Sequence, residues 1–226
     1  GKSLVFVPNT QPDQIPELNS FLEEWGMSVG SGVMFELSTD HLYNNTTPFW
    51  SAAEYVDEDY SSVITNKSIP VSVMQSRPIE ILKESESIKV LLESTENSGI
   101  YPVDAAEGWQ PEESDLTGPV TLAAVSTKQV SGVDDVSNVA VVGSAAAFAS
   151  SLLSSTSVNN SAYFINMFNT LAEREDTVLI EAKTLGGATM SVTTNVSIPL
   201  GVVFTIVLPL LILVTGLVIW IRRRNR

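Results

Sequence analysis

The chain has 226 residues, with 26 acidic and 12 basic side chains and a formal net charge of −14 at pH 7. This excess of negative charge argues against nucleic acid and anionic lipid headgroups as partners, because both repel an acidic surface. The chain has no cysteine, which excludes disulfides, thiolate metal sites and a thiol nucleophile.

A compact apolar strand is predicted first, at Leu4–Val7, with only three residues ahead of it. Strands of this kind are normally parallel and buried between neighbours in a sheet. We therefore expect this strand to lie inside a sheet, and we expect earlier sequence to belong to the complete protein.

An amphipathic helix is predicted next, with Asp13 as a possible cap and Gly26 at its C-terminal end. Its apolar face is formed by residues near helical spacing: Ile15, Leu18, Leu22 and Trp25. With a short strand at Met27–Val29, the order is strand, helix, strand, which is typical of an α/β domain.

The segment Leu37–Ser62 has no apolar period and is predicted to be a long surface loop. It contains His41, the only histidine, which we interpret as a solvated loop residue rather than a member of a Ser-His-Asp triad. The run Asp57-Glu58-Asp59 lacks the alternating pattern of a calcium loop and is interpreted as a solvated group of charges.

Short apolar runs separated by polar or Gly/Pro-containing turns predict five further strands. They are Val71–Met74, Ile79–Leu82, Ile88–Leu92, Val120–Val125 and Asn138–Val142. A second amphipathic helix follows, capped by Asn160 or Ser161, with a stripe that we expect to pack on the sheet. The stripe consists of Phe164, Met167, Phe168 and Leu171.

Gly143-Ser144 follows the last strand and resembles two known motifs only in part. The segment Gly143–Ala147 is neither G-x-S-x-G, which presents a serine nucleophile, nor G-x-G-x-x-G, which binds dinucleotides. A tight turn explains Gly143, so no catalytic residue, cofactor site or metal site is predicted. A carboxylate pair for glycoside hydrolysis cannot be selected among 26 acids, and this activity stays an alternative.

Asn-x-Ser/Thr sequons begin at Asn44, Asn66, Asn159 and Asn195, and one at Asn45 overlaps the first. They matter only in a secretory pathway that has a suitable transferase. In a chain rich in Asn, Ser and Thr they are expected to arise by chance.

The run Leu200–Ile221 has 22 residues without a charge, and a helix of that length spans roughly 30 Å of hydrocarbon. Arg222, Arg223, Arg224 and Arg226 follow it, and basic flanks stay on the cytoplasmic side. The remaining part has eight basic against 26 acidic residues and is predicted to lie outside. Trp220 falls where an interfacial aromatic is expected, and Pro209 is expected to kink the helix or to be compensated by a neighbouring helix.

These patterns predict four parts: an extracytoplasmic α/β domain at 1–183, a linker at 184–199, a transmembrane helix at 200–221 and a cytoplasmic tail at 222–226. The linker assignment depends on the Gly/Ser/Thr-rich composition of Thr184–Ser197. We therefore expect a single-pass protein of the cell membrane.

An ordered set of segments resembles the auxiliary component of ABC transporters associated with gliding motility in bacteria. The corresponding segments are Gly1–Val7, Ile15–Met27, Ser76-Arg77, Val90–Ser98, Val139–Phe148, Asn160–Asp176 and Ile206–Arg224. The residues that fall on the family's helix pattern are Asn166, Asn169, Leu171, Ala172, Glu175 and Asp176. Ser144 and Ala146 stand where the family usually has acidic residues, and Thr170 replaces its usual Trp, so a ligand role of the acidic pair does not carry over.

The resemblance implies a fold similar to class I glutamine amidotransferases, which is flavodoxin-like, without the catalytic cysteine. It also implies a non-catalytic accessory subunit or module that works with a polytopic permease and a separate cytoplasmic ATPase. The chain has no Gly-x-x-x-x-Gly-Lys-Ser/Thr loop of its own. Two alternatives stay open: a membrane-anchored cell-wall glycan hydrolase and a tethered binding or adhesion module that works alone.

Overall fold

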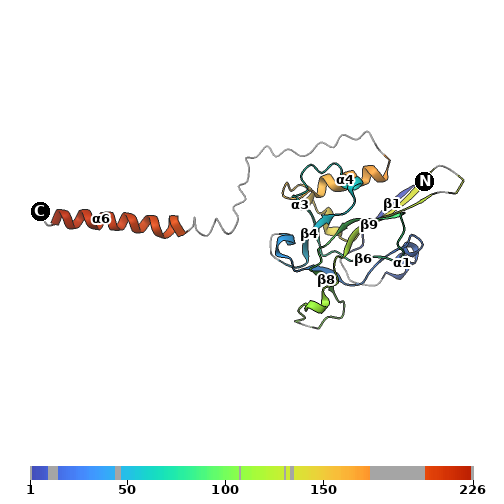
Figure 1. Cartoon of the computed structure of the whole chain (residues 1–226), viewed down its shortest axis with the longest axis horizontal. Coiled ribbons are helices and arrows are strands. Elements are labelled where there is room, and N and C mark those ends of the chain that lie inside the picture. Colours follow the sequence, from blue (N-terminus) through green and yellow to red (C-terminus); the bar gives the residue numbers. More distant parts are fainter. Residues whose placement is uncertain are drawn as a thin grey trace. The chain divides into compact units, whose positions relative to one another are not determined.

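The computed structural model describes residues 2–9, 15–43, 47–106, 108–129, 131–132, 135–173 and 202–224. The chain divides into two compact units, Gly1–Ala182 and Lys183–Arg226. The first, which we call the α/β unit, contains the strands and short helices, and the second, the helical unit, contains one long apolar helix (Figure 1). The predicted α/β class with one apolar C-terminal helix is confirmed.

A curled, mixed sheet forms the centre of the α/β unit. Its strand order is β1 (Ser3–Phe6), β10 (Val136–Val142), β9 (Thr121–Gln129), β7 (Ile88–Glu93), β4 (Trp50–Tyr55) and β5 (Val71–Met74). The pair β1–β10 is parallel, and the other neighbouring pairs are antiparallel. The β7–β9 register shifts on both sides of Leu92, and such irregularities increase the local twist of a sheet.

Strand β1 lies at one end of the described sheet, which corrects the expectation that it is buried between neighbours. Leu4 is 47% exposed. The next strand, β2 (Met27–Val29), pairs antiparallel with β6 (Ile79–Ile81) in a separate two-stranded ribbon. The strand, helix and strand predicted at the N-terminus therefore exist, but the two strands belong to different sheets.

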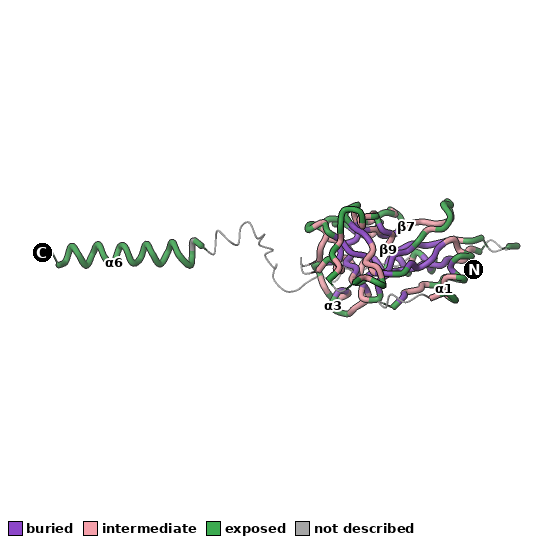
Figure 2. The backbone as a smooth tube through the Cα atoms, turned by 90° about the horizontal axis from the view of Figure 1, so that it is seen from below, coloured by how far each residue is buried: buried purple, intermediate pink, exposed green. Residues whose placement is uncertain are grey.

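Strands β9 and β10 are covered on both faces. Successive side chains of a strand point to opposite sides, and here each side belongs to a different core. Ala123 and Val125 belong to a core with helix α4 (Asn160–Leu171), whereas Ala124 belongs to a second core with helix α1 (Pro16–Glu23). On β10, Ala140 and Val142 face the first core and Val139 and Val141 the second. The buried residues accordingly follow the middle of the unit in Figure 2.

Helix α1 confirms the first predicted helix. It begins at Pro16, and Ile15 occupies the cap position without a capping side-chain hydrogen bond. Leu22 is completely buried, and Gly26 ends the helix with φ of 76°, a conformation that glycine adopts without strain. Asp13 lies outside the described residues.

The prediction of a long loop at Leu37–Ser62 is wrong. The segment contains a 3₁₀ turn at Thr39–His41, strand β4 and helix α2 (Glu58–Ser61). Strand β4 was not recognised because its buried residues, Ser51, Ala52 and Ala53, are small and give no apolar alternation. The hydroxyls of Ser51 and of Ser72, on the neighbouring β5, are buried without a hydrogen-bond partner in the described part of the chain.

The five later strands are confirmed, with small differences in their ends. Besides β4, two strands were not predicted, β3 (Val33–Glu36) and β8 (Ser98–Tyr101), which pair with each other. Short helical turns complete the α/β unit at Glu113–Asp115 (η3), Ala145–Phe148 (η4) and Ser150–Leu153 (α3).

Helix α4 covers one face of the sheet with most of its predicted stripe. Phe164, Met167 and Leu171 are at most 3% exposed, as expected. Phe168 is 43% exposed, so the expectation that it is buried is wrong. It lies at the rim of the core, where its ring is 6.2 Å from that of Phe148.

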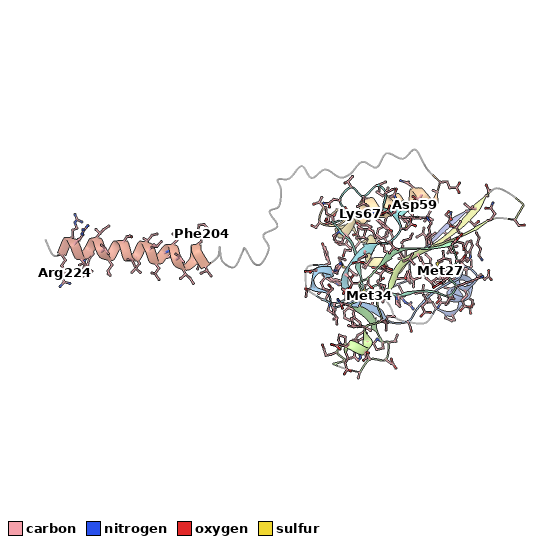
Figure 3. The ribbon with its side chains drawn as sticks, in the orientation of Figure 1. Met27, Met34, Asp59, Lys67, Phe204 and Arg224 are labelled. Carbon is pink, nitrogen blue, oxygen red and sulfur yellow. The ribbon has the colours of Figure 1, made fainter. Side chains whose placement is uncertain are left out.

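The helical unit consists of a π-helical segment, Val203–Val207, followed by α6 (Leu208–Arg224). The stretch Phe204–Arg224 is long and apolar enough to cross a membrane, and Figure 3 labels these two residues near its ends. The wider π-helical turn ends two residues before Pro209, whose ring conflicts with regular α-helical hydrogen bonding. The Arg224 guanidinium lies 5.3 Å from the centre of the Trp220 ring. Leu200 lies outside the described residues.

The burial of α4 leads to a stability prediction. Phe164→Ala should lower the free energy of unfolding by about 3–5 kcal/mol, because it leaves a cavity in an enclosed core. Phe168→Ala serves as the matched control and should cost less than half as much, because a large part of its ring already contacts solvent. Denaturant unfolding of the solubilised chain, followed by circular dichroism, measures both values. Equal losses would contradict the different burial of the two rings.

Candidate functional site

His41 is held at the surface by the turn that precedes β4. Its backbone N–H donates to the Ser38 carbonyl at 2.9 Å, and the adjacent Leu42 forms a bridge with Ser51 of β4. This places the His41 ring beside Glu54, with Nε2 3.2 Å from Oε1. Nδ1 lies 3.4 Å from Ser38 Oγ. His41 therefore belongs to a structured turn and contacts Glu54, instead of lying in the long loop that was expected.

Glu54 faces a second carboxylate across the sheet. Glu54 on β4 and Glu93 on β7 are directly paired in the antiparallel register. Burial raises the pKa of Glu93, and the nearby Glu54 carboxylate raises it further. Like charges directly opposite each other destabilise a strand pair. The arrangement thus places two carboxylates and an imidazole close together.

A buried carboxylate, Glu36, fixes the two chain segments on either side of this group. It is fully buried and accepts hydrogen bonds from the backbone N–H of Ser38 at 2.8 Å and of Thr95 at 3.2 Å. The Thr95 hydroxyl lies 2.9 Å from both carboxylate oxygens. Glu36 therefore joins the segment after β3 to the turn after β7, and so positions both walls of the site.

Two open depressions, each of about 460 Å³, lie on the two sides of the His41–Glu54 pair. The first also includes Glu93 and Thr95, and the second includes Asp40, Tyr55 and Lys67. The carboxylates in both walls can accept hydrogen bonds from a ligand and can attract a cationic group. We take the two depressions, together with His41, Glu54 and Glu93, as the candidate site.

No sequence motif pointed to this group. Residues 41, 54 and 93 are far apart in the chain, and Glu54 and Glu93 meet only through the pairing of a strand that was predicted as loop. Strand β4 has no apolar alternation and contains the charged Glu54, so neither the strand nor the site could be recognised from the sequence.

Ser144 has a structural position. Its buried hydroxyl donates to the Met74 carbonyl at 2.6 Å and accepts from the N–H groups of Met74 and Ala147, each at 3.2 Å. It ties the end of β5 to the turn after β10. Gly143, directly before it, lies so close to the Arg77 carbonyl and the Ser76 hydroxyl that a side chain would collide with both.

The run Asp57-Glu58-Asp59 is not simply solvated, which corrects the earlier interpretation. Asp57 caps α2 by accepting from the Tyr60 N–H at 3.2 Å. Lys89 on β7 lies 3.1 Å from Asp57 and 2.7 Å from Asp59, and the hydrogen bond to Asp59 raises the pKa of Lys89. Within the described residues, no group of three or more His, Cys, Asp or Glu side chains could hold a metal ion.

The residues of the family pattern on α4 have distinct environments. Asn166 is buried and donates to the Tyr60 carbonyl at 2.9 Å. Leu171 is in the core, and Asn169 is half-buried near the end of the helix. Glu175 and Asp176 lie outside the described residues.

Together these features define a mixed α/β domain with an acidic surface site, in a chain that also contains one helix suited to a membrane. No family model and no curated protein matches the chain. A solved structure described as the mmIFT52 N-terminal domain has a similar fold, with a TM-score of 0.53 and 14% sequence identity. The match covers 78% of this chain and 67% of the other, and at this identity it shows a likeness of fold alone.

The Glu93 environment gives a pH-dependent prediction. A raised pKa in the folded state means that the folded chain binds the proton more tightly than the unfolded chain, so Glu93 lowers stability as pH rises above its ordinary value of 4.5. Glu93→Gln should therefore stabilise the fold at pH 7 relative to wild type and make little difference near pH 4.

Chemical denaturation between pH 4 and pH 8 measures this difference. Glu86→Gln is the matched control, because this substitution removes the same charge from an exposed residue in the turn before β7. The control should show no such pH-dependent gain. A Glu93→Gln variant that is less stable at pH 7 than wild type would contradict the described environment.

Proposed function

We propose that the chain is a non-catalytic accessory subunit or module of a bacterial ABC transport system. The α/β unit lies outside the cell membrane and binds a substrate or a partner protein. The helix Phe204–Arg224 crosses the membrane and packs on a polytopic permease, whose ATPase is a separate cytoplasmic subunit.

The observation that carries this proposal is the apolar helix with its basic end. The described residues of α6 are exposed within the chain, so lipid or the helices of another protein must cover their apolar side chains. Arg222, Arg223 and Arg224 follow the apolar stretch and favour a cytoplasmic C-terminus. Gly216 has no side chain and has open space around its Cβ position, so another helix can approach the backbone closely there.

The segments that resemble the gliding-motility transporter family support the proposal through their structural roles. The Arg77 N–H donates to the Gly143 carbonyl at 2.9 Å. Asn160 accepts from the Ser72 N–H and donates to the Ser72 carbonyl, each at 2.8 Å. These residues hold the framework together, so a shared pattern at these positions implies a shared framework. On this basis we assign the α/β unit to a glutamine-amidotransferase-like fold that has no catalytic cysteine.

A binding role suits the candidate site better than catalysis. His41 and Glu54 are 36% and 49% exposed in their side chains, and the depressions beside them are open. General acid–base and nucleophilic groups act most effectively where water is excluded. The Ser144 hydroxyl is already engaged by Met74 and Ala147.

One observation favours a second candidate, a membrane-anchored glycan hydrolase. Glu54 and Glu93 are paired across two strands, burial raises the pKa of Glu93, and a pair of carboxyl groups is what glycoside hydrolysis uses. Incubation of the purified chain with cell-wall glycans tests this. Release of soluble sugar by the wild type, and its loss in Glu54→Gln, would favour the hydrolase.

The accessory role is tested by purification in mild detergent. The wild type should copurify with a polytopic permease and an ATPase, and Gly216→Leu should lower their recovery about tenfold or more, because the added side chain separates the packed helices. Val218→Leu, two residues further on the other side of the helix, is the control and should retain them. Recovery of the chain without partners would favour a tethered module that works alone.

Membrane orientation is tested with two introduced thiols in the cysteine-free chain. Glu58→Cys places a thiol at a side chain that is 92% exposed in the α/β unit, and Asn225→Cys places one after the basic cluster. A membrane-impermeant maleimide applied to intact cells should label the first variant and not the second. The reverse pattern would show the opposite orientation.

A further inference from the structure

Two of the sequons lie in described parts of the structure, and their amide nitrogens differ in availability. Asn66 begins the sequon Asn66-Lys67-Ser68 between α2 and β5, and Asn159 begins the sequon before α4. N-linked glycosylation uses the amide Nδ2 as the nucleophile. An acceptor asparagine therefore needs an Nδ2 that is free of strong hydrogen bonds and open to a large enzyme.

Asn159 does not meet this requirement. Its Nδ2 donates to the Ile69 carbonyl at 2.7 Å, to the Tyr55 hydroxyl at 3.0 Å and to the Asn66 carbonyl at 3.1 Å. These bonds fasten the turn before β5 to the start of α4. A glycan on this nitrogen would break the connection in the folded domain.

Asn66 meets the requirement. Residues 65–68 are all exposed, and the Asn66 Nδ2 donates no hydrogen bond within the described part of the chain. Its Oδ1 accepts from the Ser68 N–H at 3.0 Å, which turns the amide towards the third residue of the sequon. Lys67, labelled in Figure 3, has a side chain that is 48% exposed, so the whole triplet can enter a transferase.

The backbone of this turn is nevertheless well fixed. The Asn66 carbonyl accepts from the Ile69 N–H at 3.2 Å and from Asn159. The contacts of the two sequons are therefore complementary, because Asn159 uses its amide to hold the turn that presents Asn66.

We propose that Asn66 is an N-glycosylation site, and this inference depends on the proposed placement of the α/β unit outside the membrane. The donor is an oligosaccharide linked through phosphate or pyrophosphate to a polyprenyl lipid. The Asn66 Nδ2 forms a bond to the anomeric carbon as the bond from that carbon to the phosphate oxygen breaks. The electron pair leaves with the lipid phosphate, and the amide proton passes to a base of the transferase.

The position has a consequence for the candidate site. Lys67 and Ser68 line the depression that also includes His41 and Glu54. A glycan on Asn66 would therefore stand at the rim of this depression. The other depression, which includes Glu93 and Thr95, does not contain residues of the sequon.

The experiment uses the full chain purified from membranes of its native cell, with peptide mass spectrometry across residues 66 and 159. We expect hexose-containing additions on the peptide that contains Asn66 and none on the peptide that contains Asn159. Asn66→Gln and Ser68→Ala should each abolish the addition, since the hydroxyl residue is part of the acceptor. Lys67→Ala retains the sequon and should remain modified.

Two results would overturn the proposal: a peptide with only the unmodified mass at Asn66, or an addition at Asn159 instead. The thiol-labelling experiment separates the causes. An unmodified Asn66 in a chain whose Glu58→Cys thiol is labelled from outside rejects the glycan and leaves the proposed function intact. An unmodified Asn66 with a shielded Glu58→Cys thiol rejects the proposed orientation as well.

Discussion

The α/β unit depends on a buried guanidinium. Arg77 is fully buried, and its Nε and Nη2 both donate to the Gly30 carbonyl, at 3.2 and 2.9 Å. A buried charge is tolerated only when hydrogen bonds replace its lost hydration, so the loop after β2 must stay where this carbonyl can accept. The backbone of the same segment connects to Met34 of β3 and to Gly143 after β10. One dipeptide, Ser76-Arg77, thus fixes the β2 loop, β3 and the end of the central strands.

The candidate site is built outward from that fixed centre. Strand β3, anchored at Met34, ends in Glu36, which orients the segments of Ser38 and Thr95. Strand β4 then brings Glu54 to His41 on one side and to Glu93 on the other. The walls of the site are secured by buried hydrogen bonds, whereas the charged groups that face the depressions are half-exposed. Such a surface keeps its shape while its charges remain available to a ligand.

The sequence predicted those elements in which large apolar residues carry a clear period. Strand β10 and helix α4 are examples, since Val139, Val141 and Val142 of the strand and Phe164 and Met167 of the helix are buried. Strand β4 could not be predicted, because alanine and serine fill its buried positions and because its ends are aromatic and acidic. The exposure of Phe168 depends on where the sheet ends beneath α4, and the meeting of His41, Glu54 and Glu93 depends on strand pairing. Neither property is local in sequence.

The two buried serine hydroxyls on β4 and β5 have a consequence for how the domain opens. Each unsatisfied hydroxyl costs about 1–3 kcal/mol, and both lie at the end of the sheet opposite β1. The central strands β9 and β10, covered on both faces, have no such deficit among their described side chains. Local unfolding should therefore begin with β5 and β4, and amide hydrogens there should exchange before those of β10. Because Glu54 belongs to β4, the first subglobal opening of this fold would also separate it from His41 and Glu93.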